Sequence, residues 1–183
     1  MHNMFLEWLR WAIDNVEEGY YSHSERVYCY ELYHLIRVRM YFFEKNGGNL
    51  NGIYLNNEIV KRMITQEEAR FFNVDALDGQ RIPDFLFHTP GNFDNQIATM
   101  EVKKADLTTR DLLDDIMKIN QMMDRYNYQL GIFHVINNSL ERVMDIVNNQ
   151  RNTLRNMRGD ILFIIKPGFG HESHEFRLEY ALR

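Results

Sequence analysis

The run YQLGIFHVIN, residues 128–137, constrains the fold more than any other feature of this sequence. It is nearly continuously apolar and has the length of a strand, which indicates a buried strand. Helical patterns lie on either side of it along the chain. The order of predicted elements is helix, strands, helix, strand, helix, strand, and this order describes one α/β domain that spans residues 1–183.

Apolar residues at helical spacing and the helix-start signals predict the helices. They are expected at 4–18, 24–44, 58–72, 107–126 and 139–157. Strand candidates other than the first run are short segments rich in branched and aromatic residues. They cover 53–55, RIPDFLFHT (81–89), QIATMEVKKA (96–105), DILFIIK (160–166) and HEFRLEYAL (174–182). Because the turn-forming Pro90-Gly91-Asn92 joins the second and third of these five, they are expected to form a hairpin.

Charge and composition limit the environment and the partners. The chain carries 21 Lys and Arg against 26 Asp and Glu, a formal net charge of −5. A net acidic domain does not coat nucleic acid non-specifically, so any nucleic-acid role must depend on a local site. The single cysteine, Cys29, excludes an internal disulfide framework. The sequence shows neither a signal peptide nor a membrane span, which predicts a cytoplasmic protein without a membrane partner.

Three charged residues in the predicted hairpin point to metal chemistry. Asp84 lies at or near the start of one strand, and Glu101 and Lys103 lie two apart in the next. Alternate residues of a strand share a face, so Glu101 and Lys103 are expected to project together, with Asp84 alongside. Paired carboxylates are the oxygen ligands that Mg²⁺ requires, and a nearby ammonium can stabilise charge on a phosphate. The hairpin therefore predicts a Mg²⁺ (or Mn²⁺) site.

This motif resembles that of the PD-(D/E)xK nuclease superfamily, which has a restriction-endonuclease-like fold. The matching residues are Pro83-Asp84 and, after sixteen intervening positions, Glu101-Val102-Lys103. The resemblance implies an α/β fold in which helices flank a central mixed β-sheet. Its core would cover about residues 24–136, with an extra N-terminal helix at 4–18 and a C-terminal helix and strands at 139–183. It further implies a Mg²⁺-dependent endonuclease, with Asp84 and Glu101 as metal ligands and Lys103 assisting the attacking water.

The same resemblance suggests where a further ligand and a DNA surface should lie. Many members of the superfamily add an acidic residue from the first core helix, and Glu31 is the candidate here. DNA would bind through a local basic face, for which Arg151, Arg155 and Arg158 at about one-turn spacing are candidates.

Other interpretations of the same residues stay open. Glu101 and Lys103 can form an ordinary exposed ion pair across two strands. A nuclease-like fold without catalysis can serve as a protein-binding or regulatory module, using its aromatic N-terminal helices. Trp8 and Trp11 are candidates either to cover the core or to form a homodimer contact. A carboxylate site can also act on a phosphate ester that is not a nucleic acid.

Overall fold

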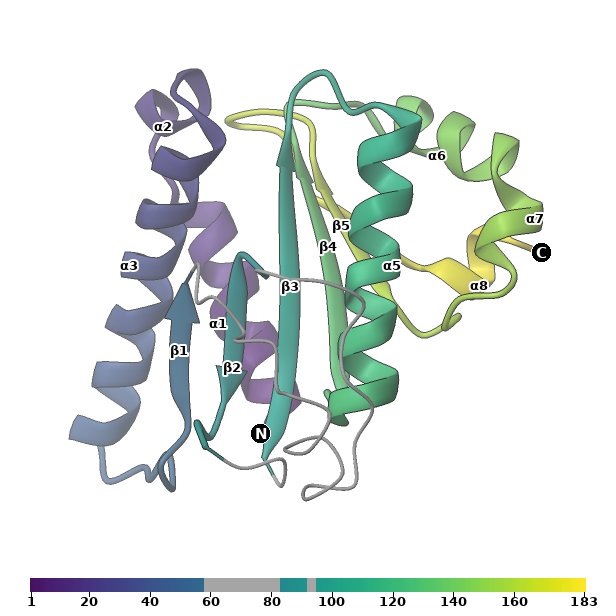
Figure 1. Cartoon of the computed structure of the whole chain (residues 1–183). Coiled ribbons are helices and arrows are strands. Elements are labelled where there is room, and N and C mark those ends of the chain that lie inside the picture. The colour runs from purple at the N-terminus through teal and green to yellow at the C-terminus, as the bar shows by residue number, and fades with distance from the viewer. Residues whose placement is uncertain (58–82, 92–94) are drawn as a thin grey trace.

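A mixed six-stranded sheet forms the centre of the computed structural model, which describes residues 1–57, 83–91 and 95–183 (Figure 1). The strands follow one another in the sheet in chain order. They are β1 (Tyr54–Asn57), β2 (Phe85–His88), β3 (Gln96–Lys104), β4 (Leu130–Ile136), β5 (Leu162–Lys166) and β6 (His174–Arg177). Neighbours β3, β4 and β5 are parallel, whereas β1, β2 and β6 pair antiparallel to their neighbours. The predicted α/β class and the mixed sheet are thus confirmed.

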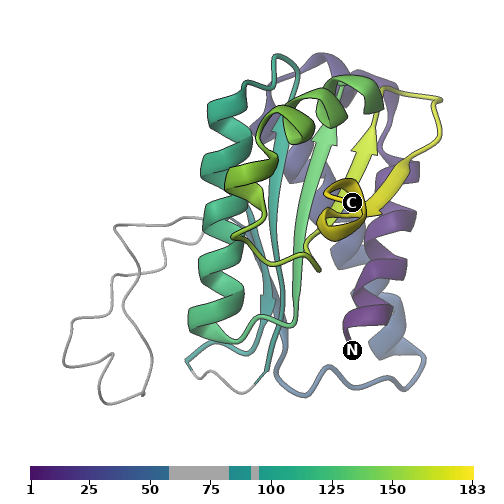
Figure 2. The same cartoon turned by 90° about the vertical axis from the view of Figure 1, so that its right-hand side faces the viewer.

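Helices cover both faces of this sheet (Figures 1 and 2). One face carries α1 (His2–Asn15), α2 (Glu18–Ser22) and α3 (Glu25–Lys45). The other face carries α5 (Thr109–Tyr126), α6 (Leu140–Asn149), α7 (Arg151–Leu154) and α8 (Leu178–Ala181). None of the helices within the described ranges is long and apolar enough to cross a membrane.

Hydroxyl caps fix where the main helices begin. The side chain of Ser24 accepts the amide of Val27 at the start of α3, and that of Ser139 accepts the amide of Arg142 at the start of α6. Thr108 and Asp111 form a reciprocal capping box at the start of α5. Such caps satisfy amides that have no partner inside the helix. The helix starts expected near residues 24, 107 and 139 are confirmed.

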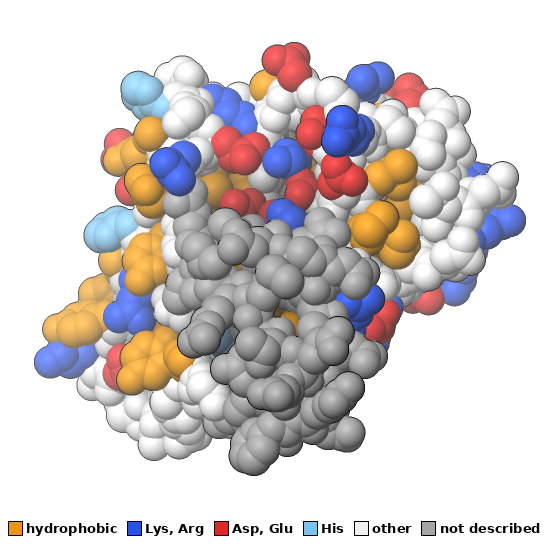
Figure 3. Space-filling view, in the orientation of Figure 1, with side chains coloured by type: hydrophobic (Ala, Val, Ile, Leu, Met, Phe, Trp, Pro, Cys, Tyr) orange, Lys and Arg blue, Asp and Glu red, His pale blue; other side chains and the backbone are white. Residues whose placement is uncertain are grey.

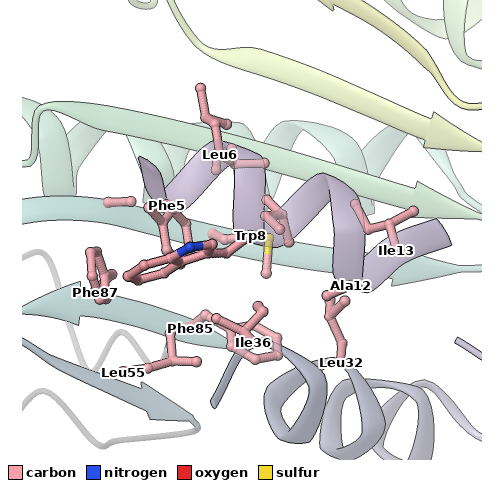
Figure 4. Close-up of a cluster of buried hydrophobic side chains, with 14 of the residues drawn as sticks. Phe5, Leu6, Trp8, Ala12, Ile13, Leu32, Ile36, Leu55, Phe85 and Phe87 are labelled. Atoms are coloured by element: carbon pink, nitrogen blue, oxygen red, sulfur yellow. The ribbon is translucent and has the colours of Figure 1, made fainter. Parts of the chain in front are cut away.

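The two sheet faces bury two separate apolar clusters. The α1/α3 side packs Phe5, Trp8, Leu32 and Ile36 against Phe87 and its neighbours (Figure 4). Phe5 stacks on Phe87 with ring centroids 4.7 Å apart. The α5 side packs Ile116 and Ile119 against β4 and β5. Because β4 is covered on both faces, its sequence does not alternate and is apolar except for His134, which is hydrogen-bonded to the Tyr28 hydroxyl and the Ile164 carbonyl.

Gly131 of β4 lets α5 approach the sheet closely. A Cβ atom built at this position would lie 2.4 Å from both Ile119 Cγ2 and Met123 Sδ. Only glycine leaves room for this contact, so the absence of a side chain here brings α5 down onto β4. Ile119 and Met123 belong to the second half of α5, so this contact holds that part of the helix against β4.

Some expected elements differ from the structure. The strand expected over residues 174–182 ends at Arg177, and α8 follows, where Leu178 is buried and its amide donates to the carbonyl of Ile161. The helix expected over 139–157 is interrupted at Gln150 between α6 and α7. The helix expected over 58–72 lies outside the described residues.

Candidate functional site

The hairpin of β2 and β3 brings Asp84 next to Glu101. Phe85 pairs with Met100, so the residue before Phe85 lies opposite the residue after Met100. Asp84 Oδ2 accepts a hydrogen bond of 2.7 Å from the Val102 amide. Val102 lies beyond the Phe85–Met100 pair, where the pairing of β2 with β3 stops. The Asp84 carboxylate therefore accepts this amide in place of a strand carbonyl. The predicted proximity of Asp84 and Glu101 is confirmed.

Two residues of α5 meet Glu101. The side chain of Glu101 is only 3% exposed, and its Oε2 lies 2.8 Å from Lys118 Nζ. The same ammonium lies 3.2 Å from Asp115 Oδ1. The other oxygen of Glu101, Oε1, is buried and accepts no hydrogen bond from any residue that the structure describes. Glu101 is therefore buried between β3 and α5, and does not form an exposed cross-strand ion pair.

Lys103 lies beside this buried group, in contact with Asp115. Its Nζ lies 3.4 Å from Asp115 Oδ2 and 3.9 Å from Glu25 Oε1. Glu25 is the first residue of α3, and its other carboxylate oxygen accepts the amide of Lys104 at 3.0 Å. Four carboxylates and two ammonium groups thus meet at one end of the sheet. We call Glu25, Asp84, Glu101, Asp115, Lys103 and Lys118 the charged cluster.

The structure does not bring Glu31 to the charged cluster. Glu31 interacts with the Tyr20 hydroxyl and raises its pKa. It lies six residues after Glu25 on α3, so its side chain is about 9 Å further along the axis and leaves the helix about 120° around. The acidic residue of α3 that reaches the motif is Glu25, where the expectation was Glu31.

Sequence reasoning also missed Asp115 and Lys118. Both lie among the apolar residues Leu112, Ile116 and Ile119 on the buried side of α5. Charged residues seldom occupy such positions unless they are paired. Their spacing was therefore a readable signal that the buried side of this helix meets other charges.

The expected basic face is not formed as one helical surface. Arg151 lies in α7, Arg155 follows that helix, and Arg158 lies beyond it. The guanidinium of Arg158 binds Asp160 at 2.8 Å and approaches Asp124 at 3.4 Å. Charged side chains instead gather at the upper part of the face in Figure 3, near the starts of α3 and α5.

Burial disfavours charge on the two motif carboxylates. Burial raises the pKa of Asp84 to about 6, although the hydrogen bond from the Val102 amide opposes the rise. Burial, together with the neighbouring charge of Asp84, raises the pKa of Glu101 well above its usual range. Such shifts, in a group of paired carboxylates, are typical of functional sites.

The two lysines remain charged. Burial acts to lower the pKa of Lys103, but the carboxylates of Asp115 and Glu25 outweigh it and the net shift is upward. Burial likewise acts to lower the pKa of Lys118, but the carboxylates of Glu101 and Asp115 outweigh it and the net shift is upward. In this arrangement both lysines act as fixed cations and not as bases at neutral pH.

The raised pKa of Asp84 predicts a pH-dependent stability. Between pH 3.8 and about 6 the folded protein holds a proton that the unfolded chain has released, so the folded state loses stability as pH rises. The Asp84→Asn variant lacks this loss. Its free energy of unfolding relative to wild type should therefore increase by about 1–3 kcal/mol between pH 4 and pH 7.

Urea unfolding of both proteins in EDTA, at half-unit pH steps, measures this difference. A difference that stays constant across the range would show that Asp84 titrates at its ordinary pKa.

The donor set suits a hard cation, although an ammonium now lies against it. Among residues 1–57, 83–91 and 95–183, no group of three His, Cys, Asp or Glu is spaced to hold a metal ion as it stands. Lys118 supplies the positive charge next to Glu101 and Asp115. Glu101 Oε1 is buried and has no hydrogen-bond partner among residues 1–57, 83–91 and 95–183. This oxygen and the neighbouring Asp84 are the kind of oxygen donors that Mg²⁺ or Mn²⁺ takes.

Comparisons with models of protein families, with curated proteins and with solved structures gave no match.

Proposed function

We propose that this protein is a Mg²⁺-dependent phosphodiesterase that cleaves DNA, built on a restriction-endonuclease-like core. The observation that carries the proposal is the meeting of Asp84, Glu101 and Lys103 at one end of the sheet. The order α3, β1–β2–β3, α5, β4 supports it, because the resemblance implies a helix, a three-stranded meander, a helix and a further strand.

Each charged group has a role suited to its surroundings. Asp84 and Glu101 would hold the metal ion, and Glu25 or Asp115 would add a carboxylate near it. When bound, Mg²⁺ supplies a Lewis acid for a phosphate oxygen and lowers the pKa of a bound water. Lys103, held as a cation, stabilises negative charge developing on the phosphate.

The direct test is cleavage of DNA by the purified chain. Supercoiled plasmid, linear duplex and single-stranded DNA are each incubated with Mg²⁺ or Mn²⁺, and with EDTA as the metal-free control. Cleavage that requires the metal and is lost in Asp84→Asn supports the proposal. Cleavage that persists in EDTA, or undiminished in the variant, contradicts it.

Lys103→Met should slow cleavage on the order of 100-fold, because it removes one preorganised positive charge from the phosphate. The affinity for Mn²⁺ should fall little, since Lys103 is not a ligand. Single-turnover cleavage and calorimetric titration with Mn²⁺ measure the two effects.

Lys104→Met is a matched control for this substitution. Lys104 is the next residue on β3, and only its backbone amide contacts Glu25. The Lys104→Met variant should cleave DNA at the wild-type rate. Equal losses in the two variants would assign the effect to general charge and not to the Lys103 ammonium.

The pairing of Lys118 with Glu101 favours one other function. An internal ammonium 2.8 Å from Glu101 neutralises the buried carboxylate without a metal ion. A nuclease-like fold that has become a binding module would keep its core charges balanced in this way. Absence of a calorimetric Mn²⁺ signal, together with absence of cleavage, would favour this module over the enzyme.

A further inference from the structure

The exposed side of α3 carries aromatic and basic residues in a single line. Tyr30, His34, Arg37, Tyr41 and Lys45 follow one another at spacings of four, three, four and four residues. Residues three and four apart share one side of a helix, so these five form a continuous stripe about 22 Å long. All five are exposed, and we call them the α3 stripe.

The rings of the stripe are unusually accessible for large hydrophobic side chains. Tyr30 is 53% exposed and Tyr41 is 54% exposed. Phe42, beside Tyr41, is also 54% exposed, and the two rings contact edge to face at 5.7 Å. Hydrophobic, basic and histidine side chains follow one another down the left edge of Figure 3, along α3. Exposed aromatic faces in one line mark a binding surface.

The stripe is locally basic in an acidic protein. The chain carries a net charge of −5, yet no acidic residue occurs between Leu32 and Phe43, a stretch that contains Arg37 and Arg39. Glu44 is the one acidic residue at the far end, and Lys45 lies next to it. Within the part of the chain that the structure describes, Arg37 and His34 form no hydrogen bond or ion pair.

Cations and rings already lie together at one end of this surface. Lys45 Nζ lies 5.3 Å from the centroid of the Tyr41 ring. A cation beside an exposed ring can bind a phosphate while the ring stacks on the attached base. An acidic peptide would satisfy the cations but would leave the rings in water.

We propose that the α3 stripe binds single-stranded DNA and leads it to the charged cluster. Stacking on aromatic rings requires unpaired bases, which a duplex does not offer, and the cations match the phosphates. Tyr30 is five residues from Glu25, about 8 Å along the helix axis and about 140° around it, so a strand that leaves the stripe at Tyr30 would pass around the start of α3 to reach the cluster. The second half of this proposal rests on the proposed nuclease function, whereas binding to the stripe does not.

Fluorescence anisotropy with a labelled 25-nucleotide oligo(dT) tests the binding. The experiment uses the full chain in EDTA at 50 mM salt, so that metal binding and cleavage play no part. Tyr30→Ala and Tyr41→Ala should each raise the dissociation constant about 5- to 100-fold, from the loss of one stacked base. Arg37→Ala should raise it less and should reduce the salt dependence of binding by about one phosphate contact.

A matched aromatic and cation on another surface provide the controls. Tyr180 is 56% exposed, and the guanidinium of Arg183 lies 4.8 Å from its ring. Tyr180→Ala and Arg183→Ala should bind oligo(dT) as the wild type does. Circular dichroism of every variant checks that the helix is intact.

Three results would overturn the assignment. They are wild-type affinity in the Tyr30 and Tyr41 variants, tighter binding of a 25-base-pair duplex than of the single strand, and tighter binding of poly-glutamate than of oligo(dT). Failure of the nuclease proposal gives a different result, namely intact binding by the stripe without metal-dependent cleavage.

Discussion

Asp84→Asn is expected to lower Mg²⁺-dependent DNA cleavage by 10²–10³-fold or more and to weaken Mn²⁺ binding, while making the metal-free protein more stable at neutral pH. Asparagine keeps an oxygen that can accept the hydrogen bond of 2.7 Å from the Val102 amide. It removes a charge that burial disfavours. A metal ligand contributes several kcal/mol to the transition state, which corresponds to the expected loss of rate.

Asp84→Asn should lower cleavage and Mn²⁺ binding but raise the stability of the metal-free protein. These opposite directions distinguish loss of a metal ligand from loss of structure. Single-turnover cleavage, calorimetric titration with Mn²⁺ and urea unfolding in EDTA measure them on the same preparation. The matched control is Asp114→Asn on α5, whose carboxylate is 59% exposed and lies 3.5 Å from Arg110. Asp114→Asn should leave all three quantities near wild type. A destabilised Asp84→Asn would assign the carboxylate a structural role instead.

Lys118→Met should have the largest effect on stability. Methionine keeps the length of the side chain but leaves the buried Glu101 without the ammonium at 2.8 Å. Removing one partner of a buried ion pair costs about 3–5 kcal/mol. The loss should be greatest near pH 8 and smaller near pH 5, because the pKa of Glu101 is already raised and the isolated carboxylate then takes up a proton.

Saturating Mn²⁺ should restore part of this stability, because a bound cation replaces the missing charge and no longer competes with the ammonium. Thermal unfolding at pH 5 and pH 8, with and without Mn²⁺, measures both effects. Lys166→Met is the control: Lys166 binds Asp14 at 2.9 Å, but that carboxylate is 62% exposed and stays solvated, so the cost should be about 1 kcal/mol or less. An equal loss at both pH values would indicate packing alone.

Local sequence signals predicted most elements of the fold. The segment Ser22–Glu25 and Ser139 indicated two of the helix starts, and the apolar run of residues 128–137 indicated the doubly covered strand β4. The C-terminal strand was extended too far because the alternation in HEFRLEYAL continues past Arg177. The chain turns there because Leu178 is buried and bonded to Ile161, a contact 17 residues away that no local pattern contains.

The sequence predicted the site residues that lie in or next to the two paired strands, but not those that the helices contribute. Two-residue alternation and the hairpin turn placed Asp84, Glu101 and Lys103 together. Glu25 differs from the expected Glu31 because the choice depends on which turn of α3 lies against the end of β3. That position is set by how α3 packs on the sheet. Lys118 reaches Glu101 because α5 packs against β3 and β4, a tertiary contact that no local pattern contains; Gly131 of β4 gives room for the neighbouring Ile119.

The hydrogen bond between Asp84 and Val102 links two properties that are usually separate. This hydrogen bond adds one interaction between β2 and β3 beyond the Phe85–Met100 pair. Its acceptor is the Asp84 carboxylate, which the proposed metal ion would also bind. Any occupant of the site that draws on this carboxylate must therefore weaken or strengthen one identifiable peptide N–H. The nitrogen chemical shift and the solvent-exchange rate of Val102 then provide a built-in readout of occupancy, observable by NMR even in a variant that cleaves nothing.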